Sequence, residues 1–290
     1  MAGKQVTELD ALPSFTDNSL LPVHNGAGLK KGLLSQLANY LGKKFNNPNL
    51  LINPDFKINQ REKSTYTAET VIYTVDRWKA WHVTVNINKN GYINIENNAY
   101  QDEGILRQQL ESTIDGPSTL SCYVESVSGT VKIEAPNNDS KIILKQGLNI
   151  LHVDGNVDSF KFTIIQGSNV TLKWAKLEQG SIATPFVAPN STEELLKCQR
   201  FYEVVNVNCK PIASVGEIYI FIPCVKKRVN PSVTMEGSKN VWFGNKEYGL
   251  TFKRSELDNS NIKVVFSTDT GEWGVGFMKN MLIKLDAEIY

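Results

Sequence analysis

The sequence lacks the features of several large protein classes. It has no apolar run near the roughly 20 residues that a membrane-spanning helix needs. Residues 1–6 lack the positive head and apolar stretch of a secretory signal, so we expect synthesis in a cytoplasm, without general export or membrane insertion. The 31 basic and 30 acidic residues give a formal net charge of +1. Because this leaves no broad positive field for a phosphate backbone, nucleic acid is not expected as a main partner.

Metal-binding side chains are also scarce. There are three histidines, and none of the four cysteines has CxxC spacing: Cys122, Cys198, Cys209 and Cys224. The sequence therefore predicts no zinc site and offers no candidate set of metal ligands, although it does not decide whether a structural calcium ion is bound, and we expect no cofactor. The thiols are interpreted as small buried hydrophobic side chains, which a cytoplasmic product favours over the alternative of disulfides.

Motifs of the common hydrolases are missing from the sequence. It has no GxSxG elbow, no HExxH zinc motif, no P-loop and no long parallel β-helix repeat. Glycoside hydrolysis needs two carboxylates across one cleft. Asp102 and Glu103 are adjacent, but neighbouring acids in a loop are typical of a solvated surface. We therefore expect a protein that is not an enzyme, with polysaccharide degradation as an alternative that released reducing ends would reveal.

The first 47 residues are predicted to form an arm and a helix. Residues 1–29 are rich in Asp, Pro, Asn and Gly and have only scattered apolar anchors, which indicates an extended arm. From Lys30 to about Phe45 the apolar residues follow spacings of three and four: Leu33, Leu34, Leu37, Tyr40 and Leu41. This pattern predicts one amphipathic helix. Its apolar stripe packs onto its own body, or else forms a bundle between copies or docks onto a particle.

Alternation of apolar and polar residues dominates the region from residue 49 to 187. It is clearest at residues 83–88, 131–134, 160–164 and 170–174, and turn residues such as Asn90-Gly91 and Asp154-Gly155 separate the segments. Short strands without long helices between them predict an antiparallel sandwich over residues 48–189, with a jelly roll as the leading candidate.

A second, smaller β unit is predicted over residues 190–290. A brief helical stretch at residues 193–196 leads into strands expected at residues 201–207, 217–223, 240–243, 249–252, 261–266 and 276–289. About a hundred residues can support a small core of their own. The predicted fold class is thus mainly β: a jelly-roll sandwich, a second smaller β-sandwich and a short N-terminal helix.

Several stretches resemble the tail fibre and receptor-binding proteins of bacteriophages. Residues 49–61 with 73–78 are similar to the opening of the carbohydrate-binding-module-like jelly roll of that family, and residues 174–186 to its closing strand. Residues 193–202, 227–234 and 285–289 resemble the C-terminal unit that often follows, and residues 6–23 a virion-attachment arm. The resemblance implies a homotrimer in the virion tail. Its N-terminal arm would bind a tail or baseplate protein, and its C-terminal unit, the receptor-binding tip, would face the cell.

Residues within these motifs are interpreted as structural. Asp76 and Arg77 are expected to form a carboxylate–guanidinium pair, and Trp78 to fill the space between two sheets. Gln199 and Arg200 are expected at a hydrogen-bonded junction between the units. A receptor role for Trp78 or Trp81 would require an exposed ring.

Two aromatic clusters of the second unit are the predicted ligand site. Sugars are bound by aromatic faces beside planar polar side chains, and loops on a β scaffold often carry function. The candidates are Trp242, Asn245 and Tyr248 in one cluster and Asp269 and Trp273 in the other. The alternative is that Trp242 and Trp273 fill a small core or a subunit interface.

The sequence thus predicts a protein that attaches a phage tail to a host cell-surface glycan. Weak single sites suffice for this task, because several copies on one fibre multiply avidity. A structural spacer or baseplate component without a glycan ligand is the alternative. Cell binding by residues 191–290 would separate the two.

Overall fold

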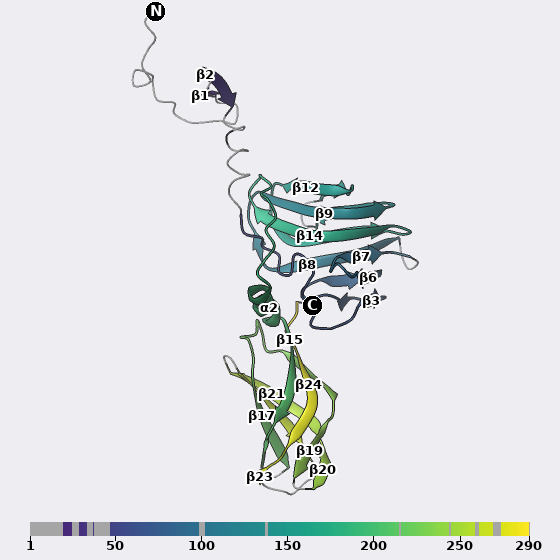
Figure 1. Cartoon of the computed structure of the whole chain (residues 1–290), viewed down its shortest axis with the longest axis vertical. Coiled ribbons are helices and arrows are strands. Elements are labelled where there is room, and N and C mark those ends of the chain that lie inside the picture. Colours follow the sequence, from purple (N-terminus) through teal and green to yellow (C-terminus); the bar gives the residue numbers. More distant parts are fainter. Residues whose placement is uncertain are drawn as a thin grey trace, which may run out of the picture.

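Strands form most of the chain, in two units that follow one another along its long axis (Figure 1). The computed structural model describes residues 20–24, 29–33, 37, 47–98, 102–136, 139–214, 216–243, 245–258, 261–268 and 274–289. A single α-helix of more than one turn, α2 (Ser191–Gln199), occurs in this described part and lies between the units.

The first unit is a sandwich of two antiparallel six-stranded sheets. The first sheet has the order β11 (Ser140–Ile143), β10 (Val131–Ala135), β13 (Val157–Ile165), β8 (Glu103–Ile114), β5 (Lys79–Trp81) and β4 (Ile72–Tyr73). The second sheet has the order β12 (Gly147–Val153), β9 (Ser118–Ser128), β14 (Asn169–Gln179), β7 (Ile93–Glu96), β6 (Val83–Ile87) and β3 (Thr65–Ala68).

The alternating sequence pattern produces this sandwich because one face of each sheet is buried. β10, for example, buries every second residue, and β12 does so along its C-terminal half. At the centre of the core Trp78 is fully buried, with its ring 6.2 Å from Phe160 and 5.0 Å from Phe56. The mainly β fold with antiparallel sandwiches is therefore confirmed.

The second unit begins at α2, whose N-terminus is capped by Asn190. The Asn190 side chain accepts hydrogen bonds from the backbone N–H groups of Thr192 and Glu193, which are otherwise without partners at a helix start. The predicted helical stretch at residues 193–196 is confirmed. The predicted boundary at 189/190 lies next to this cap and stays a prediction.

Three antiparallel sheets enclose the core of the second unit. One is β15 (Tyr202–Cys209), β24 (Met278–Asp286) and β18 (Ser232–Gly237). Another is β21 (Thr251–Asp258), β22 (Asn261–Ser267), β17 (Glu217–Pro223), β16 (Ile212–Ser214) and β23 (Gly274–Val275). The third is the hairpin β19 (Asn240–Phe243) and β20 (Lys246–Gly249). The strand predicted at residues 249–252 is interrupted at Leu250, where β20 ends and β21 begins.

The N-terminal helix prediction needs a correction. Residues 30–33 belong to a strand, β2 (Leu29–Leu33), which pairs with β1 (Leu20–His24) in an antiparallel hairpin. Gly32 disfavours a helix. Residues 20–24 also provide a strand that pairs with residues 29–33, and the spacing of apolar residues within 30–45 does not report on such a distant partner. Leu37 is helical. The remaining residues of the predicted helix, and the arm up to residue 19, lie outside the described residues.

The four cysteines are all free, and two of them, Cys122 and Cys198, are buried. Burial raises the pKa of the Cys122 thiol above its usual range. Within the described residues, no helix combines the length and apolar character needed to cross a bilayer.

Candidate functional site

An exposed tryptophan on the outer face of the first sheet marks the candidate site. Trp81, the last residue of β5, has 39% of its surface exposed although most of β4 and β5 is buried. It lies in a shallow hollow of about 310 Å³, lined by Val71, Lys79, Ala80, Trp81, Ile105 and Arg107. We call these residues the Trp81 hollow.

Strand register explains why these side chains share one face. β5 pairs with β8 so that Lys79 lies opposite Arg107 and Trp81 opposite Ile105. Directly opposite residues of an antiparallel pair point to the same side of the sheet. Two cationic side chains therefore stand beside two apolar ones on the outer face.

A sharp backbone turn fixes the position of Trp81. The next residue, His82, has φ 52°, a left-handed conformation that few non-glycine residues adopt, and the chain crosses there to β6 in the other sheet. Gly104 on β8 makes the turn possible, since a Cβ there would lie 2.4 Å from the His82 carbonyl oxygen. The indole of Trp81 stacks on the His82 ring at 4.1 Å and 28°. The His82 ring therefore supports the indole at the surface.

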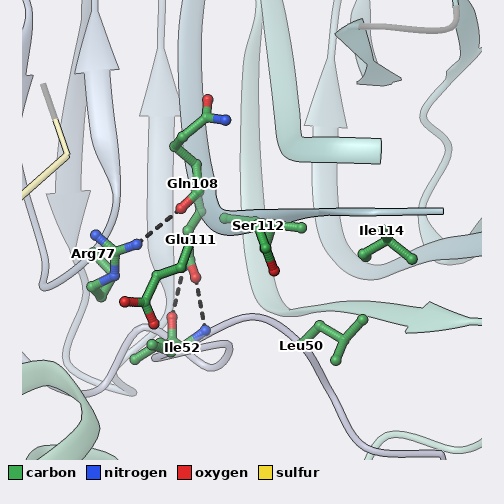
Figure 2. Close-up of a pocket in the computed structure, with 9 residues that line it drawn as sticks. Leu50, Ile52, Arg77, Gln108, Glu111, Ser112 and Ile114 are labelled. Carbon is green, nitrogen blue, oxygen red and sulfur yellow. Dashed lines mark hydrogen bonds between the residues drawn. The ribbon is translucent and has the colours of Figure 1, made fainter. Parts of the chain in front are cut away.

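A second hollow, of about 190 Å³, lies near the boundary between the units (Figure 2). The Gln108 side chain on its wall donates to the carbonyl of Ile52 and accepts from the Ile52 N–H, both at 2.7 Å. Arg77 donates to the Gln109 carbonyl at 2.9 Å. Because these polar groups already bond to the protein's own backbone, this hollow has fewer free hydrogen-bonding groups for a ligand than the Trp81 hollow has.

The predicted pair between Asp76 and Arg77 is wrong, because the two side chains have different partners. Arg77 donates to Glu288 at 2.5 Å and its guanidinium lies 3.6 Å from the ring centre of Phe201. Asp76 accepts from Gln60 and lies 3.4 Å from Arg61. Arg77 has a backbone φ of 72°, and its side chain therefore points away from that of the neighbouring Asp76.

Both residues belong to a buried junction between the units. Arg61 lies 3.6 Å from Glu288 and its guanidinium 3.8 Å from the Tyr202 ring centre. The C-terminal end of the chain returns here (Figure 1), where the Ile289 carbonyl accepts from Tyr73 at 2.5 Å and from Lys79 at 3.0 Å. Burial raises the pKa of Asp76 from 3.8 to about 6, although hydrogen bonds from Gln60 and the charge of Arg61 oppose the shift.

The predicted junction residues Gln199 and Arg200 lie at the C-terminal end of α2. The Gln199 carbonyl accepts from Lys227 at 2.6 Å, within the second unit. Arg200 forms two hydrogen bonds of 3.1 Å with Glu111 of β8, which links the two units. This pair is well exposed, in contrast to Arg77 and Glu288.

The first predicted ligand cluster is split by the hairpin of β19 and β20. Trp242 lies opposite Glu247, whereas Tyr248 lies opposite the fully buried Val241 and packs against the core. Trp242 and Tyr248 therefore point to opposite faces of the hairpin, and the ligand-binding role of the half-buried Tyr248 stays a prediction. Asn245 is exposed at the turn. Trp242 is partly exposed and bridges to Phe277 through two backbone hydrogen bonds of 2.9 Å.

Asp269 and Trp273, the second predicted cluster, lie outside the described residues. The hairpin of β19 and β20 is at the end of the second unit far from the first unit (Figure 1). Trp242, with Glu247 and Phe277 opposite it on the neighbouring backbone segments, forms a second candidate surface at that end.

Sequence reasoning missed Arg107 as a site residue, and it considered Trp81 only on the condition of an exposed ring, which the structure shows. The available signal was the alternation of Ile105 and Arg107 with buried Gly104, Leu106 and Gln108 along β8, which places Arg107 outward. The pairing with β5 and the turn at His82 carry no comparable sequence signal.

Comparisons with known proteins give only a partial structural likeness. No family model matches this sequence, and no curated protein sequence matches it. Among solved structures, a mutant of a family 29 carbohydrate-binding module has 21% identity and a TM-score of 0.28, over 42% of this chain and 98% of that chain. Another mutant, complexed with mannohexaose, has 18% identity and a TM-score of 0.27, over 43% and 96%.

Proposed function

We propose that this protein is a non-enzymatic adhesin that binds a glycan in the Trp81 hollow. The observation that carries the proposal is the exposed indole of Trp81, held by His82 beside Arg107 and Ile105. A pyranose ring presents C–H groups to an aromatic face and hydroxyl groups to planar donors. An ordered tryptophan next to a guanidinium supplies both partners on a rigid sheet, which lowers the entropic cost of binding.

The biological setting that we propose is the tail of a bacteriophage or of a tail-like particle. The resemblance of residues 49–61, 73–78 and 174–186 to tail fibre and receptor-binding proteins supports it. In this setting the protein is a homotrimer whose N-terminal arm attaches to a tail or baseplate protein, and whose ligand is a host surface glycan. A shallow hollow gives weak binding at each copy, and several copies make attachment effective.

Binding of the intact protein to host cells and to a panel of glycans tests the proposal. Trp81→Ala is expected to reduce binding by about two- to tenfold, since stacking on a ring is worth about 0.5–1.5 kcal/mol. Trp242→Ala tests the competing surface, because it removes another partly exposed indole at the far end of the chain, and it is expected to leave binding unchanged. Light scattering gives the molar mass and so tests the trimer.

Each alternative predicts a different result. Full binding by Trp81→Ala with loss in Trp242→Ala would place the ligand at the tip surface instead. Failure of the intact protein to bind any cell or glycan would favour a spacer. Reducing ends released from a polysaccharide would contradict a purely binding role.

A further inference from the structure

The Trp81 hollow has an unbalanced charge. Among the residues that line it are two cations, Lys79 and Arg107, and no carboxylate. The two face each other across β5 and β8. Burial lowers the pKa of Lys79 and the positive charge of Arg107 lowers it further, although the charge of Glu288 in the junction opposes the shift. The hollow therefore contains like charges whose repulsion an anion would relieve.

Arg107 has no partner of its own among the residues that the structure describes, and in this it differs from the other arginines. All six arginines are described, and the other five donate hydrogen bonds to carboxylates or carbonyls: Arg61, Arg77, Arg200, Arg228 and Arg254. No ion pair or hydrogen bond joins the Arg107 guanidinium to another described residue. Its fork of donors is thus available to a ligand.

The cations next to Arg107 are already engaged. Lys161, opposite it on β13, pairs with Glu134 at 2.5 Å. Lys79, on the other side, donates to the Ile289 carbonyl at 3.0 Å. Lys79, Arg107 and Lys161 thus form a row across three neighbouring strands. Of these three, Arg107 alone has no hydrogen-bond acceptor or ion-pair partner in the described part of the chain.

We infer that the Trp81 hollow takes an acidic saccharide, whose carboxylate or phosphate binds Arg107 while a sugar ring stacks on Trp81. This inference rests on the proposed glycan-binding function. Arginine donates two parallel hydrogen bonds to a carboxylate or phosphate, and such charge-assisted bonds are about twice as strong as neutral ones. A uronic acid and a phosphate-linked sugar polymer share this chemistry.

Binding of the full chain to three kinds of polymer tests the inference: a polyuronate, a sugar-phosphate polymer and a neutral mannan. We expect one or both acidic polymers to bind more tightly than mannan, with affinity that falls as salt increases. Arg107→Gln is expected to weaken acidic binding at least about tenfold, and Arg107→Lys to weaken it less. Lys141→Gln, the same charge change on the exposed edge strand β11, is the matched control and should leave binding unchanged.

The outcomes separate the inference from the function on which it rests. Preference for the polyuronate or for the sugar phosphate identifies the anion. Equal binding of mannan, lost in Trp81→Ala but kept in Arg107→Gln, would overturn the acidic ligand and leave the glycan site intact. Binding of any polymer that neither variant weakens would overturn both. Circular dichroism of each variant excludes a folding defect as the cause.

Discussion

Two arginines of the first unit, Arg77 at the junction and Arg107 in the Trp81 hollow, have opposite surroundings. Arg77 is 2% exposed, pairs with Glu288 and covers the Phe201 ring. Arg107 is partly exposed and has no acceptor within the described residues. A buried cation needs a partner because desolvation is costly, whereas a surface cation does not. The first arrangement is therefore explained by folding alone, and the second leaves a donor for a ligand.

The comparison also concerns two tryptophans three positions apart. Trp78 is completely buried and donates its indole N–H to the Asn53 carbonyl at 2.9 Å, whereas Trp81 is 39% exposed. One ring has no surface left for a ligand and the other has. Exposure, and not residue type, distinguishes the structural aromatic residue from the candidate binding residue.

The largest effect is expected from Arg77→Ala. It leaves Glu288 buried with Arg61, at 3.6 Å, as its remaining ion-pair partner among the described residues, and breaking a buried pair typically costs about 3–5 kcal/mol. Chemical unfolding of the intact chain measures the free energy of unfolding. The double variant Arg77→Met/Glu288→Leu removes both charges and should recover most of the loss. No loss in the single variant would show that the pair does not stabilise the junction.

The next effect is a pH dependence caused by Asp76. Its pKa is about 6 in the folded protein and 3.8 ordinarily, so the folded state binds the proton more tightly. The contribution of Asp76 to stability is then largest below about pH 4 and falls as pH rises through about 6. Relative to Asp76→Asn, the free energy of unfolding should fall by about 3 kcal/mol across this window. Unfolding of both proteins at several pH values measures the difference, and a constant difference would contradict it.

The smallest effect on stability is expected from Arg107→Ala. This side chain has no described acceptor to lose, and surface substitutions of this kind usually change the free energy of unfolding by less than about 0.5 kcal/mol. The same unfolding measurement as for Arg77→Ala applies. A loss of more than about 2 kcal/mol would mean that Arg107 has a structural role, which would weaken the contrast between the two arginines.

Much of the fold could be predicted from the sequence, because alternation reports which face of a strand is buried. The strands at residues 217–223 and 240–243 agree with β17 and β19 to the residue. The pattern could not reveal that residues 30–33 pair with a second strand, since helical and strand spacing are hard to separate over so few residues.

The site was less predictable because it depends on contacts between distant residues. Arg77 and Glu288 are 211 positions apart, so the neighbouring Asp76 was the partner that the sequence suggested. The inward direction of Tyr248 depends on its register with Val241. The exposure of Trp81 depends on the left-handed backbone conformation of His82. A histidine in the sequence does not by itself predict this conformation.

Fluorine NMR of the intact chain with fluorotryptophan tests the central claim most directly, because each of the five tryptophans gives its own signal. Single Trp→Phe variants assign the signals. When a glycan that the protein binds is added, the Trp81 signal is predicted to shift or broaden while the signals of Trp78 and Trp242 stay in place. A shift confined to Trp242 or Trp273, with Trp81 unchanged, would contradict a binding site in the Trp81 hollow.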